Sequence, residues 1–130
     1  MTLTPSMDQA PENAETFQRR THDWMLECFG EALAADRLER NHRFIEEALE
    51  LVQSAGMPQT EAHMLVDYVY GRPAGETSQE VGGVMVTLAA LCSSHDIDML
   101  ATGEMELNRI NAPEITAKIR QKQMTKPRRV

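Results

Sequence analysis

The chain has 130 residues, a net charge of -7 and two cysteines. A chain of this length can bury a hydrophobic core without disulfides or a structural metal, so we expect one folded domain. The acidic balance argues against a protein that coats a nucleic-acid polymer. The sequence has no apolar run of about 20 residues and no signal-like N-terminus, so we expect no membrane partner and predict a cytoplasmic location.

Taken in chain order, the sequence predicts a flexible arm, a helical domain and a short tail. Residues 1–12 combine two prolines with small and polar residues and form the predicted arm. The single helical domain is predicted over residues 13–124, and a basic flexible tail over residues 125–130. The predicted helices run from Phe17 to about Ala35, from Asp36 or Arg37 to Ser54, from a Thr60 cap to Gly71, from Thr77 to about Ser94, from Met99 to Ile110 and from Glu114 to Met124.

Apolar spacing and helix-ending residues support these bounds. Apolar residues recur every three or four positions after Phe17, Gly30 marks a possible kink, and Gly56 with Pro58 ends the second helix. The segment at residues 77–94 is apolar nearly all the way round, so we expect it to be buried on most sides. The predicted architecture is all-α, an antiparallel helical bundle.

The second helix carries three acids within one turn, Glu46, Glu47 and Glu50. One interpretation is a solvated helix face, because a bundle helix needs one and glutamate favours helices. However, each like-charge pair at this spacing costs roughly 0.2–0.5 kcal/mol. Arg43 can offset part of the charge of Glu46 and Glu47, whereas Glu50 has no cation three or four residues further on. The second interpretation is therefore a site for a divalent cation such as Mg²⁺, which binds a few carboxylates and keeps water and phosphate in its other positions.

Glu80 is the only acid in the apolar segment at residues 79–93, and it has two interpretations. It is either a further metal ligand, or the glutamate of a capping box at residues 77–80 that folds back on the first backbone N–H. Gly82 and Gly83 follow within the same predicted helix, where each costs roughly 1 kcal/mol relative to alanine. Close packing of another helix and room for a ligand are both explanations for them.

The order of these motifs resembles the MazG-type all-α nucleoside triphosphate pyrophosphohydrolases. The matching residues are the E-E-x-x-E motif at 46–50, Glu80, the turn "HDID" at 95–98 and the late Asn108. The resemblance spans about residues 15–123. It implies a Mg²⁺-dependent enzyme, with Mn²⁺ as a substitute, that converts a nucleoside triphosphate into a monophosphate and pyrophosphate, for example in house-cleaning of non-standard nucleotides.

By the same resemblance, Glu47, Glu50 and Glu80 are metal ligands, Glu46 is an accessory catalytic acid and Asn108 contacts the substrate. Arg72, in the connector before Glu80, could reach a phosphate because its guanidinium group suits phosphate oxygens. The family also implies self-association as a dimer or tetramer.

The sequence departs from the family pattern at two positions, with Gly83 in place of an aspartate and Glu104 in place of a lysine. The first change removes a metal ligand and the second removes a phosphate partner. Possible replacements for the missing acid are Asp67, Asp96 and Asp98. A second hypothesis is therefore a catalytically weakened or inactive helical protein that binds nucleotide or assembles with itself on the same scaffold.

Overall fold

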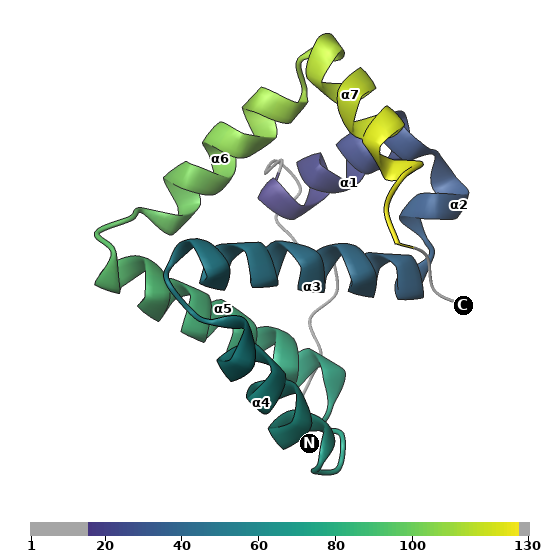
Figure 1. Ribbon diagram of the computed structural model, residues 1–130. Helices are drawn as coiled ribbons and strands as arrows, with labels where there is room; N and C mark the ends of the chain where they lie inside the picture. The colour runs from purple at the N-terminus through teal and green to yellow at the C-terminus, as the bar shows by residue number, and fades with distance from the viewer. Residues whose placement is uncertain (1–15, 128–130) are drawn as a thin grey trace.

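A computed structural model describes residues 16–127 of the chain. These residues form seven α-helices and no β-strand, which confirms the predicted all-α class (Figure 1). The helices are α1 (Phe17–Phe29), α2 (Glu31–Ala34), α3 (Arg37–Ser54), α4 (Gln59–Tyr70), α5 (Thr77–Ser94), α6 (Met99–Ile110) and α7 (Pro113–Gln123). The predicted arm at residues 1–12 and the last three residues of the predicted tail lie outside the described range.

The first predicted helix is divided in two at Gly30. The Thr16 side chain caps α1 by accepting a hydrogen bond from the backbone N–H of Arg19 at 3.1 Å. Gly30 has a φ of 83°, in the left-handed region that residues with a Cβ rarely adopt. The helix therefore stops at Phe29 and resumes as the short α2, where the sequence predicted one helix with a kink.

Local signals also set the ends of the longer helices. The side chain of Asp36 accepts a hydrogen bond from the backbone N–H of Glu39 at 3.1 Å, and α3 begins after it as predicted. The predicted Thr60 cap of α4 is wrong. That helix already begins at Gln59, because Pro58, with its φ of -69°, leads the chain directly into the first turn. The observed bounds of α5 and α6 match the prediction.

The hydrophobic core lies where α1, α6 and α7 meet. It consists of the buried residues Trp24, Cys28 and Leu107, against which Met25, Phe29, Ile110 and Ile119 pack. The indole N–H of Trp24 points to the Ile110 carbonyl at 3.1 Å and to the Thr116 hydroxyl at 3.3 Å. Its ring also meets Phe29 edge to face. These contacts make Trp24 a core residue and connect α1 to α6 and α7.

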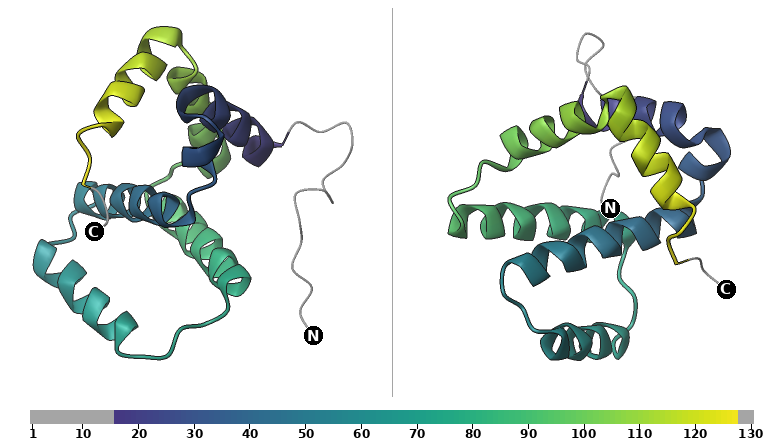
Figure 2. Two further views of the ribbon diagram at one scale, coloured as in Figure 1. Left: turned by 90° about the vertical axis from the view of Figure 1, so that its right-hand side faces the viewer. Right: turned by 45° about the horizontal axis from the view of Figure 1, so that its top comes forward.

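The other helices lie around this core in an open arrangement. α3 crosses the molecule, with α4 and α5 below it and α6 and α7 above it in Figure 1, and the left-hand view of Figure 2 again shows α6 and α7 above α3 and α4 below it. Most close packing joins helices that are neighbours in the chain, and α1 against α7 is the main contact between helices distant in sequence. The all-α class is thus established, while the antiparallel bundle of the MazG type stays a prediction.

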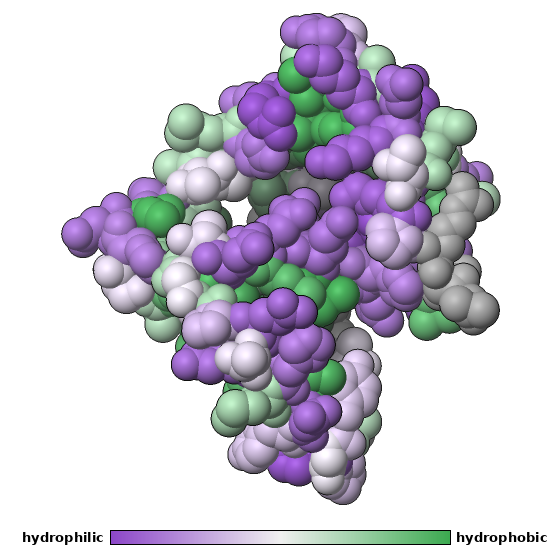
Figure 3. Space-filling view, viewed as in Figure 1, coloured by the Kyte–Doolittle hydropathy of each residue, from purple (hydrophilic) through white to green (hydrophobic). Residues whose placement is uncertain are grey.

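α5 is not buried within one chain, contrary to the prediction for residues 77–94. Val81 is 56%, Met85 is 59% and Val86 is 70% exposed, and no residue of α5 is fully buried. The prediction is wrong because no helix in the described part of the chain packs closely along the side of α5 that carries Val81, Met85 and Val86. Further apolar surface lies open along α3, where α4 and α5 pass beneath it (Figure 3).

Among residues 16–127, no single helix is both long enough and apolar enough to cross a membrane. α5 and α6 pass that test only as a pair, and they are bent by 99° at the break between them.

Candidate functional site

The acidic turn of α3 places its three glutamates in different surroundings. The side chain of Glu46 is partly buried and forms ion pairs, whereas Glu47 and Glu50 are exposed. Within the described residues, no hydrogen bond or ion pair engages Glu47 or Glu50. The turn therefore presents two free carboxylates, three residues apart, and a third that is already paired.

A cavity of about 520 Å³ lies beside this turn, between α3 and the start of α4; we call it the α3–α4 cavity. Glu46 and Glu50 line it, together with the apolar residues Ile45, Leu49 and Val52. The cavity thus lies at the border between the acidic turn and the apolar side of α3. Its volume is in the range of small-molecule sites, which are mostly apolar with a few polar groups.

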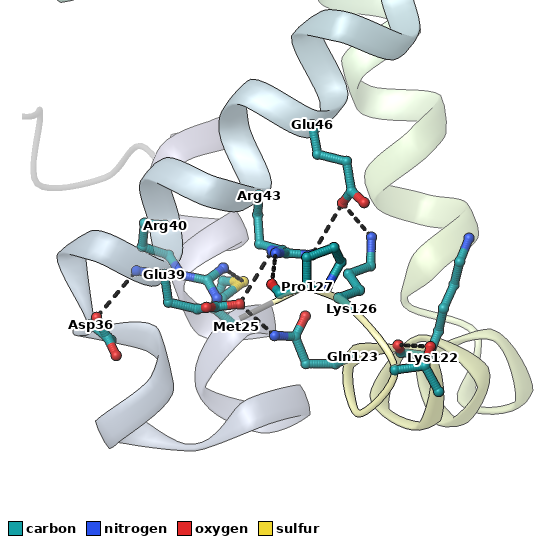
Figure 4. A network of polar contacts seen from close by, with 11 residues as sticks. Met25, Asp36, Glu39, Arg40, Arg43, Glu46, Lys122, Gln123, Lys126 and Pro127 are labelled. Carbon is teal, nitrogen blue, oxygen red and sulfur yellow. Dashed lines mark hydrogen bonds and ion pairs between the residues drawn. The ribbon is translucent and has the colours of Figure 1, made fainter. Parts of the chain in front are cut away.

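Glu46 is held by two cations (Figure 4). Nη1 of Arg43 lies 3.3 Å from Oε1 of Glu46, which confirms the predicted local pairing for this residue. The ammonium group of Lys126, from the end of the chain, contacts the same oxygen. The hydrogen bond from Lys126, supported by the charges of Lys126 and Arg43, holds the pKa of Glu46 below its ordinary value. Glu46 is therefore ionised, and its charge is balanced within the chain.

Glu80 does not cap α5, so the capping-box interpretation is wrong. The cap is Glu76, whose carboxylate accepts hydrogen bonds from the backbone N–H groups of Ser78 and Gln79 at 3.2 and 3.0 Å. These bonds and the Ser78 hydroxyl lower the pKa of Glu76. The carboxylate of Glu80 lies instead over Gly75, where a Cβ atom added to the glycine would approach Oε1 of Glu80 to 3.2 Å. Glu80 is thus free of a structural role at the helix start.

Glu80 and Arg72 line a second, larger cavity of about 1240 Å³ between α3 and the start of α5; we call it the α3–α5 cavity. The guanidinium carbon of Arg72 lies 4.2 Å from the centre of the Tyr68 ring, a cation–π contact that orients the side chain. His42 and Ile45 line both cavities, so the two open on adjacent sides of α3. The structure therefore brings Glu46 with Glu50, and Glu80 with Arg72, as two separate pairs.

Asn108 and Glu104 lie on α6, away from both cavities. Asn108 is exposed and lines neither of them. Glu104 forms an ion pair with Arg20 of α1, which lowers the pKa of Glu104 and links the two helices. The position where the resemblance expects a lysine thus has a structural role in this chain.

The proposed replacement acids do not complete a metal site within one chain. Asp98 caps α6 by accepting a hydrogen bond from the Ala101 backbone N–H at 2.9 Å, and Asp96 occupies the turn before it with a φ of 56°. Asp67 lies on the exposed surface of α4. No group of three or more histidine, cysteine or acidic side chains in residues 16–127 is arranged to hold a metal ion.

The acidic turn by itself fits a hard ion in part. Glu47 and Glu50 offer carboxylate oxygens without a competing cation, and Mg²⁺ is commonly held by one or two carboxylates with water and phosphate in the remaining positions. Glu80 does not lie beside Glu50 in the single chain, because the two residues line different cavities. Glu47 and Glu50 therefore offer oxygen donors of the kind that Mg²⁺ prefers, but no third acidic, histidine or cysteine side chain in residues 16–127 joins them in a metal-binding arrangement.

No family model, no curated protein and no solved structure matches this chain.

Lys126 is the contact at this site that sequence reasoning missed, because the tail was predicted to be flexible. Residues 125–127 instead lie against α3. Opposite charges separated by 80 positions carry no local signal. The only hint in the sequence is a basic tail in an otherwise acidic chain.

Proposed function

We propose that this chain is a Mg²⁺-dependent nucleoside triphosphate pyrophosphohydrolase of the MazG-like type that works as a homo-oligomer in the cytoplasm. The observation that carries the proposal is Glu50, an acid of the E-E-x-x-E motif that lines the α3–α4 cavity without an ion pair in the described residues. Metal ions are commonly bound at such carboxylates, and the order of acidic motifs along the chain supports the same assignment.

In this proposal Glu47 and Glu50 hold the ion at the mouth of the cavity. When bound, Mg²⁺ supplies positive charge that stabilises the charge developing on the phosphates. Arg72 lines the separate α3–α5 cavity, so its proposed hydrogen bonds to phosphate oxygens require the triphosphate to extend from the acidic turn towards that cavity. The apolar wall of the cavity, formed by Ile45, Leu49 and Val52, offers a surface for the base or sugar of the nucleotide beside these carboxylates. The products are a nucleoside monophosphate and pyrophosphate.

Self-association is part of the proposal, and the exposed apolar residues of α5 support it. A chain that leaves Val81, Met85 and Val86 more than half exposed gains free energy when a second copy covers them. Cβ atoms built on Gly82 and Gly83 meet no atom within 4 Å in the single chain, so nothing in the described residues requires these glycines. The close approach of a helix from another copy, or of a ligand, accounts for both.

Release of pyrophosphate tests the proposed activity. Wild-type protein is assayed with a panel of nucleoside triphosphates in the presence of Mg²⁺ or Mn²⁺, beside Glu50→Gln and Glu27→Gln. Glu27 is an exposed acid of α1, so its substitution removes the same charge away from both cavities. We expect turnover in the wild type and in Glu27→Gln, and none in Glu50→Gln. Absence of turnover by the wild type with every nucleotide would contradict the proposal.

Gly83→Asp tests whether the second motif is a weakened metal site. The open space around Gly83 accommodates the new side chain, which would lie one turn from Glu80 on the same face of α5. If the family pattern describes this site, the substitution raises turnover or Mg²⁺ affinity. Gly82→Asp is the matched control, because it adds the same charge on a different face of the helix.

The second candidate is a non-catalytic helical protein that binds nucleotide or assembles with itself. Two observations favour it, Gly83 at the expected aspartate and the absence of a three-residue metal group in residues 16–127. A protein that only assembles with itself would show the same melting temperature with and without Mg²⁺ and nucleotide. A rise in melting temperature without turnover would identify a nucleotide-binding protein that has lost catalysis.

A further inference from the structure

Helix α4 lacks the packing that a helix of its composition needs. Its six large apolar residues are each at least 49% exposed, and no residue of the helix is buried. No other helix in residues 16–127 packs closely along α4, which lies away from the core formed by α1, α6 and α7 (Figures 1 and 2). α4 is thus an apolar helix without a partner in the described chain. The six residues are Met64, Leu65, Val66, Tyr68, Val69 and Tyr70.

α4 is also short for a helix without tertiary support. It has 12 residues, and isolated helices of about that length are marginal in water even in favourable sequences. No side chain caps its start, and its last turn carries no basic residue near the exposed carbonyl groups. Because most helical stability in proteins comes from packing of an apolar face, α4 needs more packing than residues 16–127 supply.

The surplus surface of the chain has the size of a subunit interface. The chain exposes 10834 Å², whereas a compact monomer of 14.6 kDa exposes about 6900 Å². An upper limit for residues 1–15 and 128–130 is about 2900 Å², the value for a fully exposed chain of their mass. Residues 16–127 therefore expose roughly 1700 Å² more than a compact domain of their size. A stable dimer buries about 800 Å² or more on each partner, so a second copy accounts for a surplus of this size.

A regular stripe of side chains runs along one face of α4. It consists of Glu61, Leu65, Tyr68 and Arg72, and we call it the α4 stripe. The spacing of four, three and four residues is the pattern of helices that pair side by side. The first three residues line neither cavity of α3, and the guanidinium carbon of Arg72 lies 4.2 Å from the centre of the Tyr68 ring. The α4 stripe is therefore a continuous surface that α3 does not cover.

The two ends of the α4 stripe carry opposite charges. Glu61 begins it and Arg72 ends it, and neither forms an ion pair within the described residues. In an antiparallel pair, a two-fold axis between Leu65 and Tyr68 places each Leu65 against the partner's Tyr68. The same axis places each Glu61 opposite the partner's Arg72, whereas a parallel pair would bring like charges together. The stripe is thus complementary to a second copy of itself in the antiparallel direction.

We propose that α4 is an assembly helix, which packs antiparallel against α4 of a second copy along the α4 stripe. The inference rests on the proposed function, because it names the face through which the proposed self-association occurs. α4 acts here in addition to the exposed apolar half of α5. Since Arg72 lines the α3–α5 cavity, the partner's Glu61 borders that cavity and completes the surroundings of Arg72.

Leu65→Lys in the full chain tests the apolar centre of the α4 stripe, with Leu100→Lys as the matched control. Leu100 is an exposed leucine of α6, so the control adds the same side chain outside the stripe. The new lysine in α4 follows Glu61 by four residues, a spacing that supports the helix, so the substitution does not weaken α4 itself. In sedimentation equilibrium we expect Leu65→Lys to raise the Kd at least about tenfold, and Leu100→Lys to stay within about twofold of the wild type.

Charge reversal tests the antiparallel direction. Glu61→Arg and Arg72→Glu each place like charges at both ends of the paired stripes, so each should raise the Kd about three- to tenfold. The double variant Glu61→Arg with Arg72→Glu restores opposite charges and should return the Kd to within about twofold of the wild type. A double variant that associates no better than the single variants would overturn the antiparallel pairing.

The outcomes separate this inference from the proposed function. If the wild type associates but Leu65→Lys and Leu100→Lys have equal Kd values, the α4 inference is overturned and self-association through α5 stands. A wild type that is monomeric at every concentration would overturn both forms of association. Pyrophosphate release by that monomer would still leave the proposed activity in place. Circular dichroism of each variant verifies that the helices are retained.

Hydrogen exchange measured at several protein concentrations gives an independent test. The backbone N–H groups of residues 63–70 bond within α4, so their protection reports on the stability of this helix. We expect their protection to rise with protein concentration, while the protection of α1 in the core stays unchanged. Full protection of α4 in the dilute monomer would show that one chain covers α4 by itself, and would overturn the inference.

Discussion

Met85 of α5 tests whether the exposed apolar half of this helix is an assembly surface. Its side chain is 59% exposed, and Val81 and Val84 lie on the same face. Complete burial of a methionine side chain contributes roughly 1.5–3 kcal/mol, so the part that one chain leaves exposed is worth about 1–2 kcal/mol on assembly. A two-fold interface contains the residue twice, so Met85→Lys should weaken a dimer by about 2–4 kcal/mol, or roughly 30- to 700-fold in Kd.

Sedimentation equilibrium over a wide range of protein concentration measures this Kd. The matched control is Gln121→Lys, which adds the same charged side chain at an exposed polar position of α7. We expect the control to associate as the wild type does. Circular dichroism before each run verifies that the variants keep their helices, so that weaker association is not mistaken for unfolding.

Two results would refute the reasoning about Met85. In the first, the wild type is folded and monomeric at every concentration, which would mean that the apolar face of α5 is stable in water. In the second, Met85→Lys associates as tightly as Gln121→Lys, which would place the interface elsewhere on the molecule.

Three further predictions concern the stability of the single chain. Leu107→Ala should lower the free energy of unfolding by about 2–5 kcal/mol in urea titrations, because Leu107 is buried in a small core. Leu100→Ala, on the exposed side of α6, should lower it far less, and equal losses in the two variants would contradict the core described above. Gly30→Ala should lower the free energy of unfolding by roughly 1–2 kcal/mol, because alanine rarely adopts the positive φ of Gly30. Gly82→Ala should raise the free energy of unfolding by roughly 0.5–1 kcal/mol, because Gly82 lies inside α5 with open space around it. Changes of the same sign in calorimetry would show that backbone conformation does not decide these effects. The hydrogen bond from Arg20 lowers the pKa of Glu104 in the folded state, so its contribution to stability is present above the ordinary value of 4.5 and is lost as the pH falls through the lowered pKa. Glu104→Gln should therefore flatten the acid side of the stability profile, and an unchanged profile would show that the pair does not contribute.

The helices could be predicted closely because their signals are local. The cap at Asp36, Gly56 beyond the end of α3 and Pro113 at the start of α7 act within about one turn of the residue concerned. The error at Thr60 has the same origin, since a proline two residues earlier already began the helix. Interactions over three or four residues can be read from the sequence itself.

The candidate site was predictable only as a set of acids on helices. The sequence places Glu46, Glu47 and Glu50 on one turn, and Arg43 within reach of Glu46, because helix geometry fixes neighbours three and four residues apart. The sequence did not decide whether Glu80 caps its helix or binds a metal ion. That choice depended on Glu76, whose side chain takes the cap in the folded chain.

The sequence alone determined the all-α class, the bounds of the main helices and the acidic turn of α3, since all three follow from spacing and capping along the chain. Only the tertiary structure decided that Lys126 reaches Glu46, that Glu50 and Glu80 line separate cavities, and that α5 remains exposed in one chain. These features join residues far apart in sequence. They depend on the directions in which whole helices leave their turns, and small changes in those directions move a side chain by more than the length of an ion pair.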